Sequence, residues 1–202
     1  MPHELPNKTT DVDYSMPAFI VLVVSALAGL YASAALVYEK IAYWELRAAG
    51  EPTALGCDIN PIVGCGNVLN TPQASIIGSI PNPILGVIAF AVFLTVSSLL
   101  LLRVDLPKWC WLGLQAGVVV GIFTTSYLQY ESIFVIGALC PWCMVVWFVT
   151  TISFWVVSAQ NIKRFGVSAL KVFSNWNLLF ILLHVASIVG IILLKFGETL
   201  WA

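Results

Sequence analysis

The sequence predicts an all-α integral membrane protein with five transmembrane helices. Of its 202 residues, 60% are hydrophobic and only 9% are charged, and the mean hydropathy is +0.95. This charge content is far below that of an ordinary water-soluble domain, so a soluble fold is excluded. A helix needs about 20 apolar residues to cross a bilayer, and five suitable runs lie at 18–37, 83–102, 109–129, within 133–157 and within 178–194.

Each of the first three runs lacks any charged residue. The fourth is also uncharged, and the fifth is short, so it spans the bilayer only if Trp176 and Lys195 sit at the two interfaces. The five runs use more than half of the chain, which leaves room for one domain, residues 1–202. The polar tail 1–16 contains no separate apolar region with a cleavage site, so the first run is expected to be a retained anchor.

The distribution of Lys and Arg between the runs predicts the orientation, because short cytoplasmic loops retain positive charge. Three basic residues fall on one side of the predicted membrane and six on the other; the six are Lys8, Arg103, Lys108, Lys163, Arg164 and Lys171. The tail 1–16 is therefore expected in the cytoplasm. The long polar segment 39–82 and a turn at 131–132, with Glu131 exposed to solvent, are expected on the outer side.

The charge of the chain argues against nucleic-acid binding, and its small number of histidines argues against a zinc site. With a net charge of −1 and no basic face, the chain offers no surface for a nucleic acid. A zinc site needs about four nitrogen or sulfur ligands, but the two histidines lie in the tail (His3) and inside the fifth run (His184). No metal site is therefore expected, and His184 is expected to be a packing residue.

Four of the five cysteines fall where this orientation puts an oxidising compartment: Cys57 and Cys65 in the outer segment, and Cys140 and Cys143 near the outer end of the fourth run. Disulfides persist outside the cytosol, so this even set is expected to form them. Cys110 lies at the inner end of the third run and is expected to be a buried free thiol.

The segment Cys140-Pro141-Trp142-Cys143 indicates redox chemistry. Pro141 suits the first position of a helix because it has no N–H to lose, so a helix is predicted to start there. At a helix N-terminus the unpaired N–H groups and the macrodipole favour a thiolate. A permanent disulfide between cysteines three residues apart in a helix would be strained, and strained disulfides are the exchangeable ones.

The pair Cys57 and Cys65 lies in a segment rich in Gly and Pro that can move. By itself this pair has two readings, a structural disulfide or an exchanging one. Because thiol–disulfide exchange passes through mixed disulfides, a second pair facing the same compartment favours a relay. Four outer cysteines still allow three pairings.

At these residues the chain resembles the vitamin K epoxide reductase family, in particular bacterial members that oxidise DsbA-like periplasmic proteins. The resemblance covers roughly residues 15 to 160. It rests on three segments in order, namely C-D-I-N-P-x-x-x-C-G-x-V-L at 57–69, P-N-P-I-L-G at 81–86 and C-P-W-C at 140–143.

The resemblance implies a four-helix bundle around a quinone, either menaquinone or ubiquinone, with a peripheral fifth helix and an outer capping half-helix. It implies a bacterial cytoplasmic membrane and a separate DsbA-like thioredoxin-fold partner. Cys57 would exchange with that partner, Cys65 would pass electrons to Cys140, and Cys143 would face the quinone. The remaining implied site residues are Thr71, which would support the thiol chemistry or only cap the half-helix, and Asn82, which would hydrogen-bond the quinone or only shape the start of the second span.

Phe90, Phe134, Trp142 and Trp147 are candidate walls of the quinone pocket. Trp147 stands where vertebrate members have tyrosine, which argues against epoxide reduction. The expected activity is thus that of a thiol:quinone oxidoreductase supporting disulfide formation. Two alternatives are a quinone or vitamin K epoxide reductase proper, and a non-catalytic membrane protein stapled by its outer disulfides.

Overall fold

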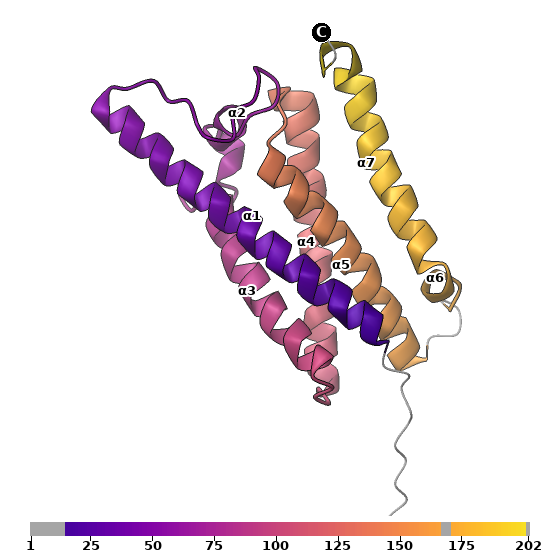
Figure 1. Ribbon diagram of the computed structural model, residues 1–202. Coiled ribbons are helices and arrows are strands. Elements are labelled where there is room, and N and C mark those ends of the chain that lie inside the picture. Colours follow the sequence, from indigo (N-terminus) through magenta and orange to yellow (C-terminus); the bar gives the residue numbers. More distant parts are fainter. Residues whose placement is uncertain (1–14, 167–170, 201–202) are drawn as a thin grey trace, which may run out of the picture.

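The computed structural model (Figure 1) describes residues 15–166 and 171–200. Within these ranges the chain forms helices and contains no strand. Five helical segments are long and apolar enough to cross a membrane: Met16–Ala49, Asn82–Leu101, Lys108–Ile136, Pro141–Phe165 and Asn177–Gly197. The predicted all-α membrane fold with five spans is confirmed. Most of the predicted tail 1–16, including His3 and Lys8, lies outside the described residues.

Four of the long helices form a bundle and the fifth packs on its outside (Figure 1). Helix α1 packs extensively against α3 and α5, and α5 packs against α4. Helix α7 reaches the bundle through α5 and the short α6. The helices are α1 Met16–Ala49, α3 Asn82–Leu101, α4 Lys108–Tyr130, α5 Pro141–Phe165, α6 Lys171–Asn175 and α7 Asn177–Leu200.

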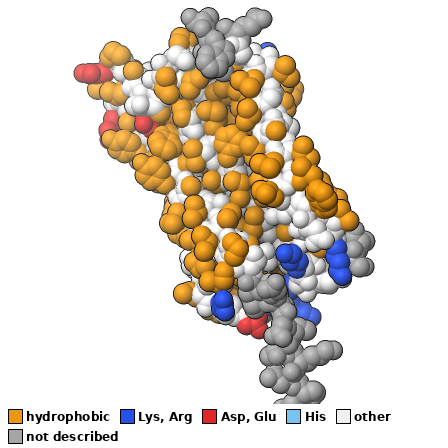
Figure 2. Space-filling model, turned by 45° about the vertical axis from the view of Figure 1, so that its right-hand side comes forward, with side chains coloured by type: hydrophobic (Ala, Val, Ile, Leu, Met, Phe, Trp, Pro, Cys, Tyr) orange, Lys and Arg blue, Asp and Glu red, His pale blue; other side chains and the backbone are white. Residues whose placement is uncertain are grey.

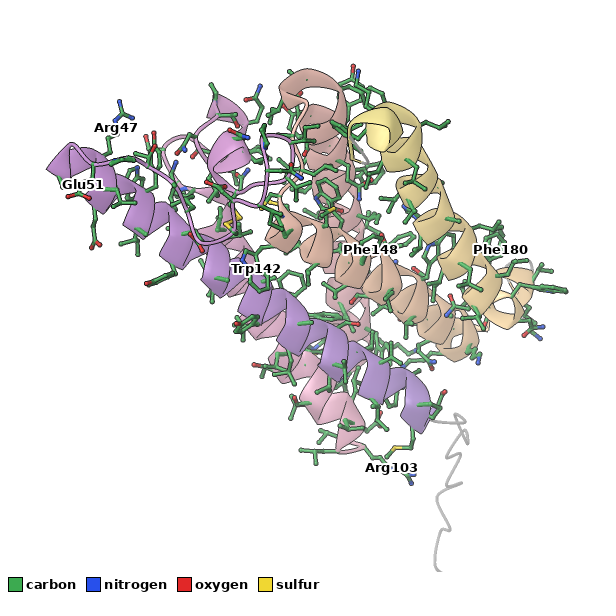
Figure 3. The ribbon with its side chains drawn as sticks, turned by 45° about the horizontal axis from the view of Figure 1, so that its top comes forward. Arg47, Glu51, Arg103, Trp142, Phe148 and Phe180 are labelled. Atoms are coloured by element: carbon green, nitrogen blue, oxygen red, sulfur yellow. A yellow bond between two sulfur atoms is a disulfide. The ribbon has the colours of Figure 1, made fainter. Side chains whose placement is uncertain are left out.

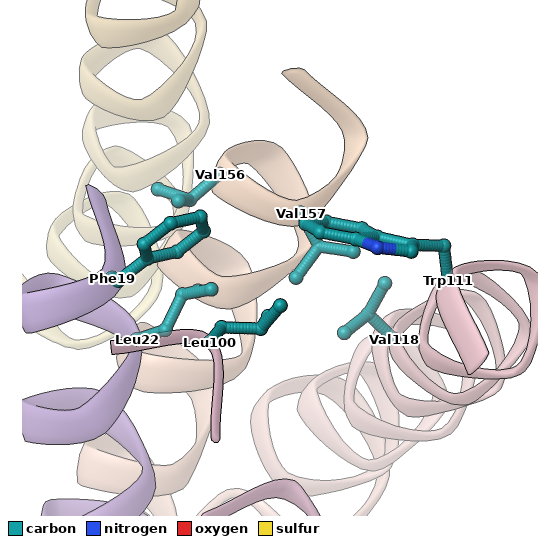
Figure 4. Packing of buried hydrophobic residues seen from close by; sticks show 7 residues of the cluster. All are labelled: Phe19, Leu22, Leu100, Trp111, Val118, Val156 and Val157. Atoms are coloured by element: carbon teal, nitrogen blue, oxygen red, sulfur yellow. The ribbon is translucent and has the colours of Figure 1, made fainter. Parts of the chain in front are cut away.

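One apolar cluster closes the bundle at the end opposite α2 (Figure 4). It joins the start of α1 to the end of α3, the first half of α4 and the second half of α5. Figure 4 shows the Trp111 indole covering Val157, while Leu22 and Leu100 meet beneath Phe19. Side chains from all four helices interlock here, so a cavity between these four helices is expected nearer α2.

Two glycines allow α1 and α3 to approach closely. A Cβ atom on Gly29 would overlap the ring of Phe90, and one on Gly86 would come within 2.6 Å of Ser33 Oγ. Small residues at such crossings let helix backbones pack tightly in a membrane, where no hydrophobic force between helices is available. The close crossing places Ser33 and Gly86 side by side on the inner face of the bundle.

The first helix is longer than predicted. It continues through Ala49, well past the end of the apolar run at residue 37, and ends at Gly50 with a φ of 72°. The predicted outer segment 39–82 therefore begins as helix. The apolar run predicted the span and not the end of the helix, and the helix continues past it because Glu, Lys, Leu and Ala are good helix formers in water as well.

The connection between α4 and α5 also differs from the prediction. Helix α4 is continued by a π-helical stretch, η2 (Glu131–Ile136), and α5 starts only at Pro141. The turn lies at residues 137–140, where Gly137 adopts a φ of 71°, and not at 131–132. Residues 133–136 thus belong to the third span, and Glu131 is half-buried in a helix and not an exposed turn residue.

The outer capping element is short. It consists of one α-helical turn, α2 (Gly66–Leu69), followed by a 3-10 turn, η1 (Pro72–Ala74). Lys40 of α1 holds it in place by donating to the carbonyl of Leu69 at 2.6 Å and to Asn70 Oδ1 at 3.4 Å. The extension of α1 beyond the bilayer therefore supports the cap from the side.

Helix α7 is attached to α5 by aromatic contacts. The Trp155 ring stacks on Phe180 at 5.1 Å, and Trp155 Nε1 donates to His184 Nδ1 at 3.3 Å. His184 thus has a hydrogen-bond partner on α5, which agrees with the expectation that it is a packing residue.

Basic side chains gather at the end of the molecule opposite α2 (Figure 2). Here Arg164 pairs with Asp105 at 3.3 Å, donates to the Leu106 carbonyl and lies over the Trp111 ring. The middle of the visible surface is almost entirely hydrophobic, as expected for a face in contact with lipid (Figure 2).

Candidate active site

The structure brings the two predicted cysteine pairs into contact. Cys57 and Cys65 form a disulfide with an S–S distance of 2.07 Å, and Cys140 and Cys143 are free thiols. Cys65 Sγ lies 3.4 Å from Cys140 Sγ, although 75 residues separate them in the chain. Figure 3 shows these sulfur atoms beside Trp142, where the loop after α1 meets the start of α5.

Backbone hydrogen bonds fix the position of Cys65 against Cys140. The loop pairs with the residue before Cys140, because Gly64 N donates to the Leu139 carbonyl at 2.9 Å and Leu139 N donates to the Ile62 carbonyl at 2.8 Å. These two bonds form a short parallel bridge between Val63 and Leu139. The two sulfur atoms therefore meet through a defined register of the backbone.

Asp58 ties together the two arms of the loop that bear the disulfide. Its carboxylate accepts from the N–H of Leu55 and from the N–H of Gly66, each at 3.0 Å. One bond lies just before Cys57 and the other just after Cys65. Asp58 was not predicted as a site residue, although its place beside Cys57 in a Gly-rich segment was a usable signal, since an unpaired loop carboxylate readily accepts backbone N–H groups.

Cys140 lies at the N-cap of α5, and Pro141 is the first helical residue, as predicted. Cys140 Sγ accepts from the N–H of Cys143 at 3.4 Å. The hydrogen bond from the Cys143 thiol, together with the N–H groups of Cys143 and Trp142, lowers the pKa of Cys140 below its ordinary value. Burial and the charge of Asp58 oppose this, but the donors at the helix start prevail.

A cavity of about 690 Å³, counting its open mouth, lies beneath the cap and is walled by α1, the cap, α3, α4 with η2, and α5. Cys143 lies on its wall, so the cavity is separated from the loop disulfide by the Cys140–Cys143 pair. Most of the other wall residues are apolar. The cavity lining also includes Ser33, Thr71, Gln73, Asn82, Glu131, Ser132 and Trp147.

Thr71 and Asn82 line the cavity, but both side chains hold the cap. Thr71 Oγ1 donates to the Val68 carbonyl at 2.8 Å and makes no capping bond to η1. Asn82 Oδ1 accepts from the N–H of Ile76, and Asn82 Nδ2 donates to the Gln73 carbonyl, both at 2.8 Å. These two bonds use the Asn82 oxygen and one of its two N–H groups.

The four aromatic residues predicted as quinone walls separate into two groups. Trp147 is 2% exposed and lines the cavity. The other three lie elsewhere: Phe90 fills the space beside Gly29, Trp142 packs edge-on against Tyr31, and Phe134 is 53% exposed against Tyr130. The sequence could not separate them because which side of a helix faces the cavity depends on packing against the other helices.

Two further observations limit the chemistry of the site. Cys110 is a free, half-buried thiol at the start of α4, far along the chain from both pairs. No group of three or more His, Cys, Asp or Glu side chains able to hold a metal ion occurs in residues 15–166 and 171–200. The described site thus places the thiols of Cys140 and Cys143 next to a mostly apolar cavity.

Comparison with known proteins agrees with this geometry. The family model for the vitamin K epoxide reductase family matches residues 20–158, which span α1 through most of α5 and include both cysteine pairs. No curated protein matches the chain. Because the match covers well over half of its length, the chain belongs to the vitamin K epoxide reductase family and is, at that general level, a membrane oxidoreductase acting between thiols and quinone.

Proposed function

We propose that this protein reoxidises a separate DsbA-like thioredoxin-fold protein on the outer side of a bacterial cytoplasmic membrane and passes the electrons to a quinone. The observation that supports the proposal most directly is the 3.4 Å separation of Cys65 Sγ and Cys140 Sγ, with Cys143 on the cavity wall. The loop disulfide, Cys140, Cys143 and the cavity thus follow one another, so electrons could pass from the loop to the cavity through the cysteines. The net reaction is dithiol plus quinone to disulfide plus quinol.

Exchange begins at the loop pair. A thiolate of the donor attacks Cys57, which is 8% exposed whereas Cys65 is fully buried. A mixed disulfide forms between donor and Cys57, and Cys65 leaves as a thiolate. The second donor thiol then attacks its own mixed-disulfide sulfur, so that the donor leaves oxidised and Cys57 is released as a thiolate.

The second exchange moves the electrons to the buried pair. The Cys65 thiolate attacks Cys140 of a Cys140–Cys143 disulfide, and Cys143 leaves as a thiolate at the cavity wall. Cys57 then attacks Cys65, which restores the loop disulfide and releases Cys140. Its lowered pKa makes Cys140 a good leaving group. A loop disulfide beside two free thiols, the arrangement in the structure, is the product of this step.

The cavity fits a quinone ring. Its walls are mostly apolar, as in most small-molecule sites, and its polar groups include the amide of Asn82. When bound there, a quinone supplies a two-electron, two-proton acceptor. Asn82, Trp147 and Cys143 would hold it against the Cys140–Cys143 pair, and the sealed core at the other end keeps water from entering the cavity from that side.

The proposed orientation of the protein in the membrane is based on where its Lys and Arg residues lie. The end bearing Arg103, Lys108 and Arg164 would face the cytoplasm, together with the N-terminus, and the loop disulfide would face the oxidising compartment. Disulfides persist in such a compartment.

The test is quinone reduction by the purified protein with a reduced thioredoxin-fold dithiol as donor. Activity should be lost in the Ala variants of Cys57, Cys65, Cys140 and Cys143 and kept in the matched control Cys110→Ala. Reduction of a quinone epoxide in preference to the quinone would assign the epoxide reductase activity instead. Four cysteines that stay oxidised during turnover would identify a non-catalytic, disulfide-stapled protein.

A further inference from the structure

Glu131 has a position that the thiol relay does not explain. Among the described residues that line the cavity, it is the one with a charged side chain. It is half-buried and lies inside a segment long and apolar enough to span the membrane. Ionisable side chains at such depth are costly, and they are found where ions or protons move.

The backbone around Glu131 departs from a regular helix. Glu131 is the first residue of the π-helical stretch η2, and its neighbour Ser132 accepts the N–H groups of both Gly137 and Ala138 on its carbonyl. The Ser132 hydroxyl in turn donates to the carbonyl of Ala138. Single turns of π-helix are frequent at functional sites, and the first two residues of this one, Glu131 and Ser132, both line the cavity.

The surroundings of the Glu131 carboxylate connect the cavity to the outside of the bundle. Tyr127, one turn earlier on α4 and 47% exposed, interacts with the carboxylate. From the other elements that wall the cavity, α5 contributes the titratable thiol of Cys143. The groups from α1, the cap and α3 are polar but neutral: Ser33, Thr71, Gln73 and Asn82.

We infer that Glu131 is the proton-transfer residue of this cavity, taking the proton of the Cys143 thiol and returning it to the reduced acceptor. The inference rests on the proposed function. As Cys140 and Cys143 form their S–S bond, two electrons leave the two sulfur atoms and two protons must reach the acceptor. One proton passes from Cys143 to the Glu131 carboxylate and on. The other is taken up from water and passes through the same carboxylate, since Cys140 is already biased toward its thiolate.

The decisive experiment is a single turnover of quinone reduction from protein whose Cys140–Cys143 pair has been reduced beforehand. Glu131→Gln should slow this step about 100-fold, the low end of the range for loss of a general acid–base. Glu131→Asp should keep most of the rate, and Glu51→Gln, which removes the same charge from the exposed loop after α1, should match wild type. Formate added to Glu131→Gln should restore the rate, because a small acid can enter the cavity in place of the missing carboxyl.

A second readout needs no quinone. In quinone-free protein at acidic pH, the infrared carbonyl band of the protonated Glu131 carboxyl, identified by its absence in Glu131→Gln, should shift promptly on transfer to heavy water. A band that does not exchange would overturn the inference. A Glu131→Gln protein that reduces quinone at the wild-type rate would also overturn it. The same holds for a Glu131→Gln protein that is slow, is not restored by formate and has a lowered melting temperature. Failure of wild type itself to reduce quinone would refute the proposed function, while the infrared result would still report proton exchange.

Discussion

Removal of the Asp58 side chain tests whether loop geometry sets the rate of the internal exchange. Asp58→Ala deletes the hydrogen bonds from Leu55 N and Gly66 N. Hydrogen bonds to a charged acceptor contribute about 1.5–3 kcal/mol when shielded, and for this exposed carboxylate we take about 1 kcal/mol each. The sum of about 2 kcal/mol corresponds to roughly a 30-fold lower population of the closed loop, taking about 1.4 kcal/mol per factor of ten.

The same substitution should move the thiol chemistry in the opposite direction. The negative charge of Asp58 raises the pKa of Cys140, so its removal lowers that pKa further and more thiolate is present at a given pH. Electron transfer from the reduced loop pair to the oxidised Cys140–Cys143 pair should still slow by up to about 30-fold, because the loop is closed in fewer molecules. In the protein whose Cys140–Cys143 pair is reduced, the thiolate absorbance of Cys140 should appear at lower pH. Rapid quenching with a maleimide followed by mass spectrometry measures the first quantity, and an ultraviolet pH titration measures the second.

A matched control is Asn67→Ala, which deletes one loop hydrogen bond, to the Pro61 carbonyl, without touching either arm beside the cysteines. It should exchange at nearly the wild-type rate. An Asp58→Ala protein that transfers electrons as fast as wild type would refute the view that this carboxylate holds Cys65 against Cys140.

Two further predictions concern the thiol pair and the bundle. Cys143→Ala removes the strongest of the interactions that lower the pKa of Cys140, so in the reduced protein the Cys140 thiolate should form only at higher pH; an ultraviolet titration referenced to oxidised protein checks this, and an unchanged titration would contradict it. Gly29→Ala forces a methyl group onto the Phe90 ring and should destabilise the protein by about 1–3 kcal/mol. Gly113→Ala, which meets nothing within 4 Å, should leave the melting temperature in detergent unchanged or raised, and equal melting temperatures for the two variants would show that the α1–α3 crossing is not tightly packed.

The sequence was sufficient for the membrane architecture and for the start of α5 at Pro141. Long uncharged runs have few alternatives to a spanning helix, because a bilayer offers no partner for an unpaired backbone group. Pro141 marked the start of α5 correctly, since a proline without an N–H fits the first turn and little else within a helix. These predictions depend on local chemistry, which a single sequence displays directly.

The parts that could not be predicted depend on contacts distant in sequence. The position of the cap is set in part by Lys40 of α1 reaching the carbonyl of Leu69, 29 residues away. The exposure of Glu131 was predicted wrongly because a π-helical turn has no simple sequence pattern. Glu131 was expected in an exposed turn, and it is half-buried in a helix. Which of the four aromatic residues line the cavity could not be told apart either, since this depends on how the helices are rotated about their axes.

The odd number of membrane crossings has a practical consequence. After five spans the end of α7 emerges at the same end of the molecule as α2 and the loop disulfide (Figure 1). A soluble redox domain joined to the C-terminus by a flexible tether would thus be released on the face where Cys57 lies. Tethering of this kind gives an effective concentration in the millimolar range, so a fusion would convert a collisional encounter between two proteins into an intramolecular one without altering the bundle.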